Sequence, residues 1–381
     1  MSLPCIVIAG GGTGGHVFPG LAVADALRTL ANVEVVFVGS PRGMEKDLVP
    51  PRGYRLELLD VEPMKGGGFG RAFRGAFVAM RATGAALGLV SRLAPKAIVS
   101  VGGYAAGPVS LAGVVKRVPL AVLEPNAMMG LANRLLLPLA ARAYVAWEEA
   151  AKGARTAAVR LSGVPIRPNF QPAPYGLEHG ARRVLVMGGS LGAEALNERV
   201  PDALADFAKK SDRRLEVVHQ TGKGRDEAVR ARYAALGLAN VTVAPFLDDV
   251  AGALARADLV VARSGAGTVA EIAAVGRPAL FIPFPFAADD HQAKNADALS
   301  RAGGAVWLRQ KDAEPKRLAA ELGALLGDGK RLEEMAERAR KAGKPRAAEW
   351  IARDVLELAR VSLAKGDKRT NGAQPKPMEV S

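Results

Sequence analysis

The chain has 381 residues, of which 49% are hydrophobic and 24% are charged, and its formal net charge at pH 7 is +14. This length predicts two domains that each bury a core, and the composition excludes a chain that is disordered throughout. The single cysteine excludes an internal disulfide, and the four scattered histidines match no structural zinc motif.

Apolar runs typical of buried strands alternate with helical patterns along most of the chain. In chain order these runs are residues 5–9, 33–38, 97–101, 120–123, 143–145, 184–187, 215–219, 241–243, 259–261 and 279–282. Buried strands with helices between them predict parallel sheets that are covered on both faces. We therefore expect an α/β protein.

A turn-rich segment with four prolines, residues 162–180, separates two halves that look alike. In each half a strand leads into glycines and then into a helix, and the first of these helices is expected to begin at about Pro19. We predict an N-terminal domain over residues 1–164 and a C-terminal domain over 165–345. A helix over 346–364 is expected to pack back on the N-terminal domain, and a disordered tail follows over 365–381. Ligands of such domains bind at the carboxyl ends of the strands, here in the cleft between two domains.

One stretch has the apolar length of a membrane-spanning helix. Residues 97–115 carry no charge, but three glycines and a proline interrupt them, and the first five have the pattern of a buried strand. The apolar run at the N-terminus is too short for a signal peptide. We therefore expect neither a transmembrane segment nor secretion.

The first glycine-rich loop, residues 10–16, reads Gly-Gly-Gly-Thr-Gly-Gly-His. Such a loop before a helix presents N–H groups and the helix dipole to an anion. Three of its glycines match the GxGxxG pattern, but the second strand ends without the acid that holds a ribose. Because Arg42 could receive a 2′-phosphate instead, an NADP-dependent oxidoreductase remains an alternative, as does a loop that only packs tightly.

A later loop, residues 263–268, reads Arg-Ser-Gly-Ala-Gly-Thr and follows the predicted strand 259–261. Its small residues at a helix start suit a diphosphate, and Glu271 could accept hydrogen bonds from the ribose hydroxyls of a nucleotide. Alternatively, Thr268 and Glu271 form a capping box. No GxxxxGK[ST] motif is present, which excludes P-loop nucleotide hydrolysis.

The motifs together resemble those of the MurG glycosyltransferases of peptidoglycan synthesis. They are residues 10–27 (GGGTGGHVFPGLAVADAL), 100–108 (SVGGYAAGP), 124–126 (EPN), 163–167 (GVPIR), 188–193 (GGSLGA), 246–249 (FLDD) and 263–296, which contain RSGAGTVAEI and ADDHQ. They occur in order over nearly all of both predicted domains. The resemblance implies the GT-B fold, in which two Rossmann-like, doubly wound parallel-sheet domains enclose a cleft.

The resemblance also implies a reaction, the inverting transfer of GlcNAc from UDP-GlcNAc to lipid I. The acceptor would be the C4 hydroxyl of MurNAc in undecaprenyl-pyrophosphoryl-MurNAc-pentapeptide, and the product would be lipid II. By the family pattern the C-terminal domain binds the donor and the N-terminal domain binds the acceptor. Another GT-B glycosyltransferase, acting on a glycolipid such as one built on diacylglycerol, remains an alternative.

The resemblance assigns site residues one by one. Donor contacts would come from Arg167, Ser190, Leu247, Ala266, Gly267, Thr268, Glu271 and Gln292. Acceptor contacts would come from His16, Tyr104 and Glu124, while Thr13, Gly14, Gly15 and Asn126 are assigned to both substrates. Leu123 and Leu191 depart from the His and Gln common in the family, which removes one acceptor contact and weakens one donor contact.

Inversion by a single displacement needs a base for the acceptor hydroxyl and a stabiliser for the departing UDP. His16 is our candidate base, because an imidazole with the reference pKa of about 6.5 is largely neutral at pH 7. Glu124, at the carboxyl end of a predicted strand, is the alternative base, and His16 would then orient the loop or bind the acceptor diphosphate. No DxD motif follows a strand, so we expect neither a metal nor another cofactor.

The positive charge is concentrated in the N-terminal half. Between Glu62 and Glu124 there are eight Lys or Arg and no acid. Three phenylalanines recur there at helical spacing beside two arginines, namely Phe69, Phe73, Phe77, Arg71 and Arg74. This pattern suits docking on an anionic membrane leaflet, although an amphipathic helix packed on its own sheet would show it as well.

The resemblance and the charge together predict a peripheral enzyme at the cytoplasmic face of the inner membrane. Its expected partners are UDP-GlcNAc, undecaprenyl-linked lipid I and the anionic membrane surface, with other cell-wall synthesis proteins as further candidates. The basic stretch lacks the interleaved aromatic platform of nucleic-acid-binding modules, so no nucleic acid is expected.

Overall fold

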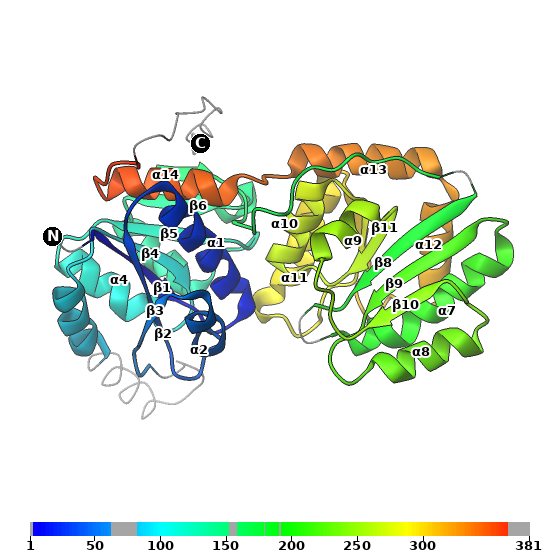
Figure 1. Ribbon diagram of the computed structural model, residues 1–381, viewed down its shortest axis with the longest axis horizontal. Helices are drawn as coiled ribbons and strands as arrows, with labels where there is room; N and C mark the ends of the chain where they lie inside the picture. Colours follow the sequence, from blue (N-terminus) through cyan, green and yellow to red (C-terminus); the bar gives the residue numbers. More distant parts are fainter. Residues whose placement is uncertain (1–2, 62–81, 152–157, 179, 190–191, 365–381) are drawn as a thin grey trace. The chain divides into compact units, whose positions relative to one another are not determined.

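The computed structural model describes residues 3–61, 82–151, 158–178, 180–189 and 192–364 (Figure 1). The chain divides into two compact units. Unit 1 comprises Met1–Arg167 together with Arg346–Ser381, and unit 2 comprises Pro168–Pro345. Each unit contains one parallel sheet, as the continuous apolar runs predicted.

Unit 1 has a seven-stranded sheet in the order β3-β2-β1-β4-β5-β6-β7. Its strands are β1 (Cys5–Gly10), β2 (Glu34–Gly39), β3 (Arg55–Leu58), β4 (Ala97–Gly102), β5 (Leu120–Glu124), β6 (Arg142–Val145) and β7 (Ala158–Leu161). Its helices are α1 (Gly14–Leu30), α2 (Glu45–Leu48), η1 (Pro50–Arg52), α4 (Ala106–Val115), α5 (Leu131–Leu136), η2 (Leu137–Leu139), α6 (Glu148–Ala151) and α14 (Ala347–Leu358). Residues 82–93 are also helical.

Unit 2 has a six-stranded sheet in the order β10-β9-β8-β11-β12-β13. Its strands are β8 (Ala181–Met187), β9 (Arg214–Gln220), β10 (Val241–Ala244), β11 (Leu259–Ala262), β12 (Ala279–Phe281) and β13 (Ala305–Trp307). Its helices are α7 (Glu194–Lys210), α8 (Asp226–Ala235), α9 (Val250–Arg256), α10 (Ala266–Val275), η3 (Ala288–Asp290), α11 (His291–Arg301), α12 (Pro315–Gly327) and α13 (Gly329–Ala342).

In both sheets the strand order changes direction beside the first strand of the unit. β1 lies between β2 and β4, and β8 lies between β9 and β11. Switch points of this kind leave a crevice at the carboxyl ends of the strands, where α/β sheets bind ligands. The glycine-rich segments predicted to bind substrates follow β1, β8 and β11, so the topology brings them to these edges.

Two helix boundaries differ from those expected. α1 begins at Gly14 and contains Pro19, because Thr13 has the extended backbone of an N-cap and the glycines form the first turn. α14 ends at Leu358, well before residue 364. Arg360 there adopts a left-handed backbone with φ of 55°, and the Val361 N–H group donates to the Leu356 carbonyl at 2.9 Å, which closes the helix.

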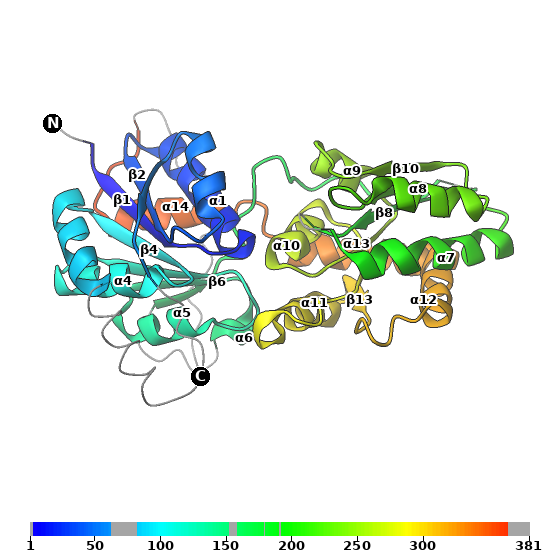
Figure 2. The ribbon, with the colours of Figure 1, turned by 90° about the horizontal axis from the view of Figure 1, so that it is seen from below.

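The sheet of unit 1 is covered on both faces by apolar side chains. On one face Leu27 of α1 and Ile351 and Val355 of α14 belong to the same buried cluster as Ile8 of β1. On the other face the helix over residues 82–93 and α4 pack against the sheet. Figures 1 and 2 show α14 beside α1, although the two helices lie at opposite ends of the chain. The last helix therefore completes the core that the first strand begins.

A buried polar cluster also holds α14 on this sheet. The Tyr144 hydroxyl donates to Asp354 Oδ2 at 2.6 Å, and the Nε atoms of Arg142 and Arg160 lie 3.3 and 3.4 Å from the same oxygen. Burial, followed by the Asp354 charge, raises the pKa of Tyr144 well above its ordinary value, so its hydroxyl stays protonated and donating.

Unit 2 is held together in part by a fully buried guanidinium. Arg277 follows α10, and its N–H groups donate to carbonyls at the C-terminal ends of α9 and α10 and to Ala173 and Pro174 of the proline-rich segment. A cation near helix C-termini satisfies carbonyls that have no intrahelical partner. Arg277 thereby attaches the start of unit 2 to its core.

Candidate active site

The glycine-rich loop after β1 packs directly against the loop after β4. A Cβ atom on Gly10 would overlap the Gly102 carbonyl, and one on Gly103 would overlap the carbonyl of Gly11. The Gly11 N–H group donates to the Gly102 carbonyl at 3.0 Å. Gly10 and Gly103 are thus explained by close backbone approach, which brings the segments 10–16 and 102–104 together at the switch point.

His16 lies in the first turn of α1 and rests on Gly102. Its Nδ1 atom is 3.1 Å from the Thr13 hydroxyl, and a Cβ on Gly102 would lie 3.3 Å from its Nε2 atom. The Thr13 hydroxyl therefore orients the imidazole, although Thr13 makes no side-chain capping bond to the helix backbone. When Nδ1–H donates to Thr13, Nε2 carries the lone pair that can take a proton.

Glu124 ends β5 and is only 1% exposed. Its carboxylate accepts four hydrogen bonds, from the N–H and Nδ2 of Asn126 at 3.1 Å each, from the Gly130 N–H at 2.9 Å and from Asn133 Nδ2 at 3.1 Å. A carboxylate has about four acceptor positions. The geometry is that of an anchor for the loop 125–130.

Two buried polar residues of this site were not predicted from the sequence. Asn133 of α5 donates to Glu124 and to the Leu123 carbonyl, and it accepts from the Ser100 hydroxyl at 3.0 Å. Glu45 of α2 accepts from the Gly12 N–H at 2.8 Å. The asparagine among leucines in the segment LANRLL could have indicated that Asn133 is a buried polar residue. No local sequence pattern indicates the role of Glu45, because its partners come from two separate loops.

Three further predicted residues of unit 1 lie near the same edge of its sheet. Tyr104 follows β4 in the glycine loop and is about half exposed, and Thr13 and Gly15 are exposed at the start of α1. Arg167, a predicted donor contact expected in the C-terminal domain, is instead the last residue of the first segment of unit 1. The residues Phe69, Phe73, Phe77, Arg71 and Arg74 lie outside the described residues.

In unit 2 the loop after β11 leads into α10, which begins at Ala266 with Gly265 as its N-cap. Gly267 and Thr268 therefore lie in the first helical turn. The capping-box interpretation of Thr268 and Glu271 is wrong, because Thr268 is already inside the helix and is not its N-cap. The N–H groups of this first turn point out of the helix toward its N-terminal side, where an anion is stabilised.

Gln292 is held beside that loop. The Ser264 hydroxyl donates to the Gln292 carbonyl at 2.8 Å, and Gln292 Oε1 accepts from the Phe284 N–H at 3.0 Å. Asn295 Nδ2 donates to the Ser264 carbonyl at 3.2 Å. These bonds bring two predicted donor segments, the one around Ala266 and the one around Gln292, to one end of the sheet.

Arg263 is a buried cation that the sequence analysis did not assign. Its Nη1 donates to the carbonyls of Ile282 and Pro283 at 2.8 and 3.0 Å, and its Nη2 donates to Gln310 Oε1 at 2.7 Å. Burial lowers the pKa of Arg263 to about 10, so it remains charged at neutral pH. Its positive charge thus lies directly before the loop that leads into α10.

Two further predicted donor segments follow β10 and β8. Leu247 lies in the loop after β10, where Asp249 caps α9 by accepting from the Gly252 N–H at 2.8 Å. After β8, the Gly189 carbonyl accepts from Gln220 Nε2 at 2.9 Å. Ser190 and Leu191 lie outside the described residues. Within the described residues no group of three His, Cys, Asp or Glu side chains could hold a metal ion.

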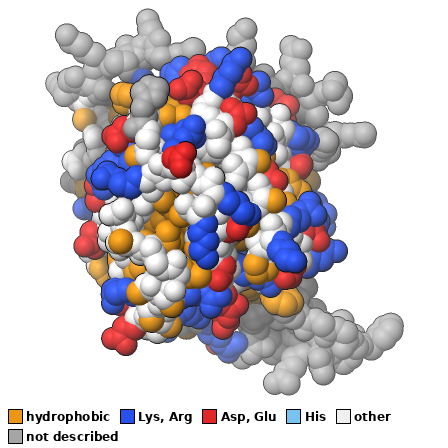
Figure 3. Space-filling view, turned by 90° about the vertical axis from the view of Figure 1, so that its right-hand side faces the viewer, with side chains coloured by type: hydrophobic (Ala, Val, Ile, Leu, Met, Phe, Trp, Pro, Cys, Tyr) orange, Lys and Arg blue, Asp and Glu red, His pale blue; other side chains and the backbone are white. Residues whose placement is uncertain are grey.

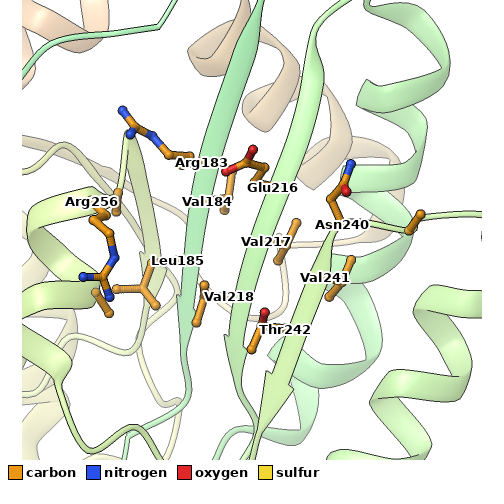
Figure 4. Close-up of a pocket in the computed structure, with 13 residues that line it drawn as sticks. Arg183, Val184, Leu185, Glu216, Val217, Val218, Asn240, Val241, Thr242 and Arg256 are labelled. Atoms are coloured by element: carbon orange, nitrogen blue, oxygen red, sulfur yellow. The ribbon is translucent and has the colours of Figure 1, made fainter.

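A groove of about 400 Å³ lies elsewhere in unit 2, over one face of β8, β9 and β10 (Figure 4). Arg183, Leu185, Val218, Thr242 and α9 residue Arg256 contribute to its lining. None of the predicted site residues lines it. The groove is therefore separate from the glycine-rich loops at the carboxyl ends of the strands.

Two domains of one protein family match this chain. Residues 6–145 match the N-terminal domain of glycosyltransferase family 28, and residues 183–351 match its C-terminal domain. The chain belongs to glycosyltransferase family 28. Its resemblance to the MurG group of this family and its GT-B fold, both expected from the sequence, are confirmed by the relatives that follow.

Curated relatives of this family 28 glycosyltransferase match it along almost its whole length. A protein of Sorangium cellulosum (strain So ce56) is 52% identical over 93% of this chain and 88% of its own. A protein of Anaeromyxobacter sp. (strain K) is 42% identical over 97% of both chains. Each is named UDP-N-acetylglucosamine–N-acetylmuramyl-(pentapeptide) pyrophosphoryl-undecaprenol N-acetylglucosamine transferase.

Solved structures agree with this grouping. The crystal structure of Acinetobacter baumannii MurG superposes with a TM-score of 0.79 at 32% identity, covering 93% of this chain and 99% of that one. The UDP-GlcNAc 2-epimerase of Neisseria meningitidis superposes with a TM-score of 0.62 at 12% identity, covering 93% of this chain and 100% of that one, and shows the shared fold alone.

The NADP-dependent oxidoreductase is thereby set aside, and the loop geometry explains why the glycine pattern was misleading. The N–H groups of Gly11 and Gly12 are already taken by the Gly102 carbonyl and by Glu45. A dinucleotide diphosphate would have to displace a buried carboxylate from this loop.

Proposed function

We propose that this chain transfers GlcNAc from UDP-GlcNAc to the C4 hydroxyl of MurNAc in undecaprenyl-pyrophosphoryl-MurNAc-pentapeptide, with inversion at the anomeric carbon. The observation that carries this proposal is the 52% identity, over 93% of this chain, to a relative named for that transfer. In this assignment unit 1 binds the acceptor and unit 2 binds the donor.

His16 acts as the base in this reaction. With Nδ1–H held by Thr13, Nε2 takes the proton of the C4 hydroxyl as that oxygen forms its bond to C1 of GlcNAc. The bond from C1 to the diphosphate oxygen breaks, and UDP leaves with the electron pair. Glu124 serves as a positioning residue that fixes Asn126 and the loop beside the acceptor, because its oxygens are already engaged.

The negative charge of the departing UDP is met by unit 2. The N–H groups of Ala266, Gly267 and Thr268 at the start of α10 are placed to bind the diphosphate, and the Arg263 charge lies behind them. Glu271, Gln292 and the backbone at Leu247 then hold the ribose, the sugar and the base, with Ser190 as a further contact. Arg167, which ends the first segment of unit 1, is assigned to the same diphosphate by the family pattern. We expect no metal or other cofactor, since these groups can stabilise the leaving diphosphate.

The test is a transfer assay with the purified full chain, radiolabelled UDP-GlcNAc and a lipid I analogue, with UDP-glucose as the control donor. We expect labelled disaccharide product from UDP-GlcNAc and far less from UDP-glucose. The variant His16→Ala should lower turnover by about 10²-fold or more, the range of general-base catalysis, and leave UDP binding unchanged. Product formed from diacylglycerol in place of lipid I would support the glycolipid alternative, and wild-type turnover in His16→Ala would exclude His16 as the base.

The protein also needs a way to reach a lipid-linked acceptor, and we propose that unit 1 docks on the anionic inner leaflet. Among the described helices, none has the length and apolar character needed to cross a bilayer. α4 and α5 pack together, and with η2 they expose five apolar side chains, namely Leu111, Val115, Leu131, Leu135 and Leu139. Lys116, Arg117 and Arg134 are exposed on the same helices or directly after them.

We call these five apolar residues and three cations the α4–α5 surface. Exposed leucines beside cations suit insertion at the boundary of an anionic leaflet, where each cation adds about 1 kcal/mol. Figure 3, in contrast, shows a face of the molecule on which basic and acidic side chains are interspersed. Lys116 and Arg117 belong to the predicted basic region, whose phenylalanines lie outside the described residues.

A further inference from the structure

Glu45 is a buried carboxylate that the proposed reaction does not use. It begins the short helix α2 and is only 1% exposed. Its Oε2 accepts from the Gly12 N–H at 2.8 Å, and its Oε1 accepts from the Ser40 N–H at 2.6 Å. The side chain thus joins the loop after β1 to the loop after β2.

Three glycines, one in the loop after β1, one at the end of β2 and one in the loop after β2, make the space for this carboxylate. A Cβ on Gly11 would lie 2.5 Å from Glu45 Oε2, and Cβ atoms on Gly39 and Gly43 would overlap the side chain as well. We call Gly11, Gly39 and Gly43 the carboxylate cradle. Close backbone approach from three sides is otherwise seen where a loop wraps around a bound anion.

The burial of this charge is energetically costly. A carboxylate removed from water is destabilising unless it is hydrogen-bonded or paired with a cation. Among the described residues the two N–H groups are its hydrogen-bond donors, and no Lys, Arg or His forms an ion pair with it. The cost of burying the Glu45 carboxylate is offset when backbone N–H groups of a glycine-rich loop point toward it and stabilise its negative charge.

We propose that Glu45 is an internal anion of the glycine-rich loop. Its carboxylate takes the place that a phosphate holds on the N–H groups of comparable loops, and it fixes the segment 10–16 in the shape that presents Thr13 and His16. Glu45 is thus a positioning residue for the acceptor half of the reaction. It also keeps nucleotide diphosphates away from the inner end of this loop, so that they bind in unit 2.

The experiment removes the Glu45 carboxylate by mutation and then supplies formate as a soluble replacement. Glu45→Ala in the full chain should lower turnover about tenfold or more, because a misplaced base of this kind costs up to about 10²-fold, while the affinity for UDP stays unchanged. Formate, which fits the vacated space and restores the charge, should recover part of the turnover. It should also raise the Tm of the variant without raising that of the wild type.

Two further variants make the result specific. Asp47→Ala removes an exposed carboxylate from the same short helix, so it should change neither turnover nor the response to formate. Glu45→Gln fills the cradle with a neutral group that turns an NH₂ toward one of the two N–H donors. It should lower turnover, and formate should not restore it. If Glu45→Ala folds only with formate, the response to formate is measured as the difference in refolding yield with and without it.

A folded Glu45→Ala protein with no formate response in Tm or turnover would overturn the proposal, as would wild-type turnover in Glu45→Gln. The kinetic part rests on the proposed function, whereas the formate-dependent Tm does not. A wild-type protein that fails to transfer GlcNAc would therefore contradict the proposed function and still leave the internal anion to be judged from Tm.

Discussion

Gly102 is the residue whose size most directly controls the position of the His16 ring. It has φ of +87°, and a Cβ there would lie 3.2 Å from His16 Cδ2 and 3.5 Å from Asn133 Nδ2. We expect Gly102→Ala to lower kcat about 10-fold, because the alanine strains the backbone at this positive φ and its Cβ crowds the imidazole, with UDP affinity unchanged. Steady-state kinetics and a UDP titration check this.

Gly107 provides the matched control, because a Cβ at this helical position would meet no atom within 4 Å. Gly107→Ala should keep wild-type kcat and slightly raise the stability of the protein. Equal kcat in the two variants would show that the contact between Gly102 and the ring has no catalytic consequence.

His219 predicts how stability depends on pH. It is fully buried, with Nδ1 2.9 Å from the Tyr233 hydroxyl and Nε2 3.0 Å from Asn197 Oδ1, and burial lowers its pKa to about 3. The unfolded chain binds a proton near pH 6.5 and the folded one near pH 3. The contribution of His219 to the free energy of unfolding is therefore fully present above pH 6.5. It falls by up to about 1.4 kcal/mol per pH unit between pH 6.5 and 3.

His219→Gln should flatten this slope in urea unfolding at pH 7, 6, 5 and 4, although the variant is less stable overall. His291→Gln, which removes a partly exposed histidine, is the control variant. An unchanged slope in His219→Gln would mean that other groups cause the acid sensitivity.

At the scale of single residues, the sequence predicted those that stand in a recognisable motif. His16 and Glu124 follow apolar strands, so their place at the sheet edge could be inferred. The difference between the surroundings of the two residues could not be inferred from the sequence, because the four hydrogen bonds to Glu124 come from a loop and from α5. Glu45 was missed for the same reason, since Gly12 and Ser40 meet it only in the folded chain.

At the scale of elements, all ten predicted strands are present, and the three that were missed share one property. β3, β7 and β13 each lie at the edge of a sheet. Charged residues interrupt β3 (RLEL) and β7 (AVRL), as the weaker burial of an edge strand allows, whereas β13 has the short apolar sequence AVW. β3, for example, has the sequence RLEL, with charged and apolar residues alternating and both ends exposed.

The α4–α5 surface yields a prediction for membrane binding. Leu135 is 67% exposed and lies between Leu131 and Leu139 along one side of α5 and η2. Leu135→Asp should weaken binding to anionic liposomes several-fold in a sedimentation assay at low salt, because it removes an inserted apolar group and adds a repelled charge. Transfer to a water-soluble acceptor analogue should be unaffected.

Phe286→Asp is the control, since Phe286 is 83% exposed but belongs to unit 2. It should leave liposome binding unchanged. Equal loss in both variants would indicate a general charge effect, and loss in neither would exclude the α4–α5 surface as the membrane contact.

At the scale of the whole molecule, unit 1 depends on a helix that follows unit 2 in the sequence. Asp354→Ala would leave two arginines and the Tyr144 hydroxyl without their shared partner. We expect it to destabilise unit 1 by about 3 kcal/mol, within the range for breaking a buried ion pair. In a urea series, transferase activity should then be lost at a lower concentration than UDP binding.

Glu357→Ala on the same helix is the control, because Glu357 is exposed, and its two urea midpoints should match those of the wild type. A parallel shift of both midpoints in Asp354→Ala would show that the two units unfold together.

The return of α14 to unit 1 has a consequence for biosynthesis. The ribosome delivers β1 and α1 first, but the apolar face of α1 that receives Ile351 and Val355 stays uncovered until all of Pro168–Pro345 has been translated. At about 5–20 residues per second, that interval is roughly ten to forty seconds. Unit 2, whose chain is continuous, can fold within this time, so the unit encoded first is the last to be completed.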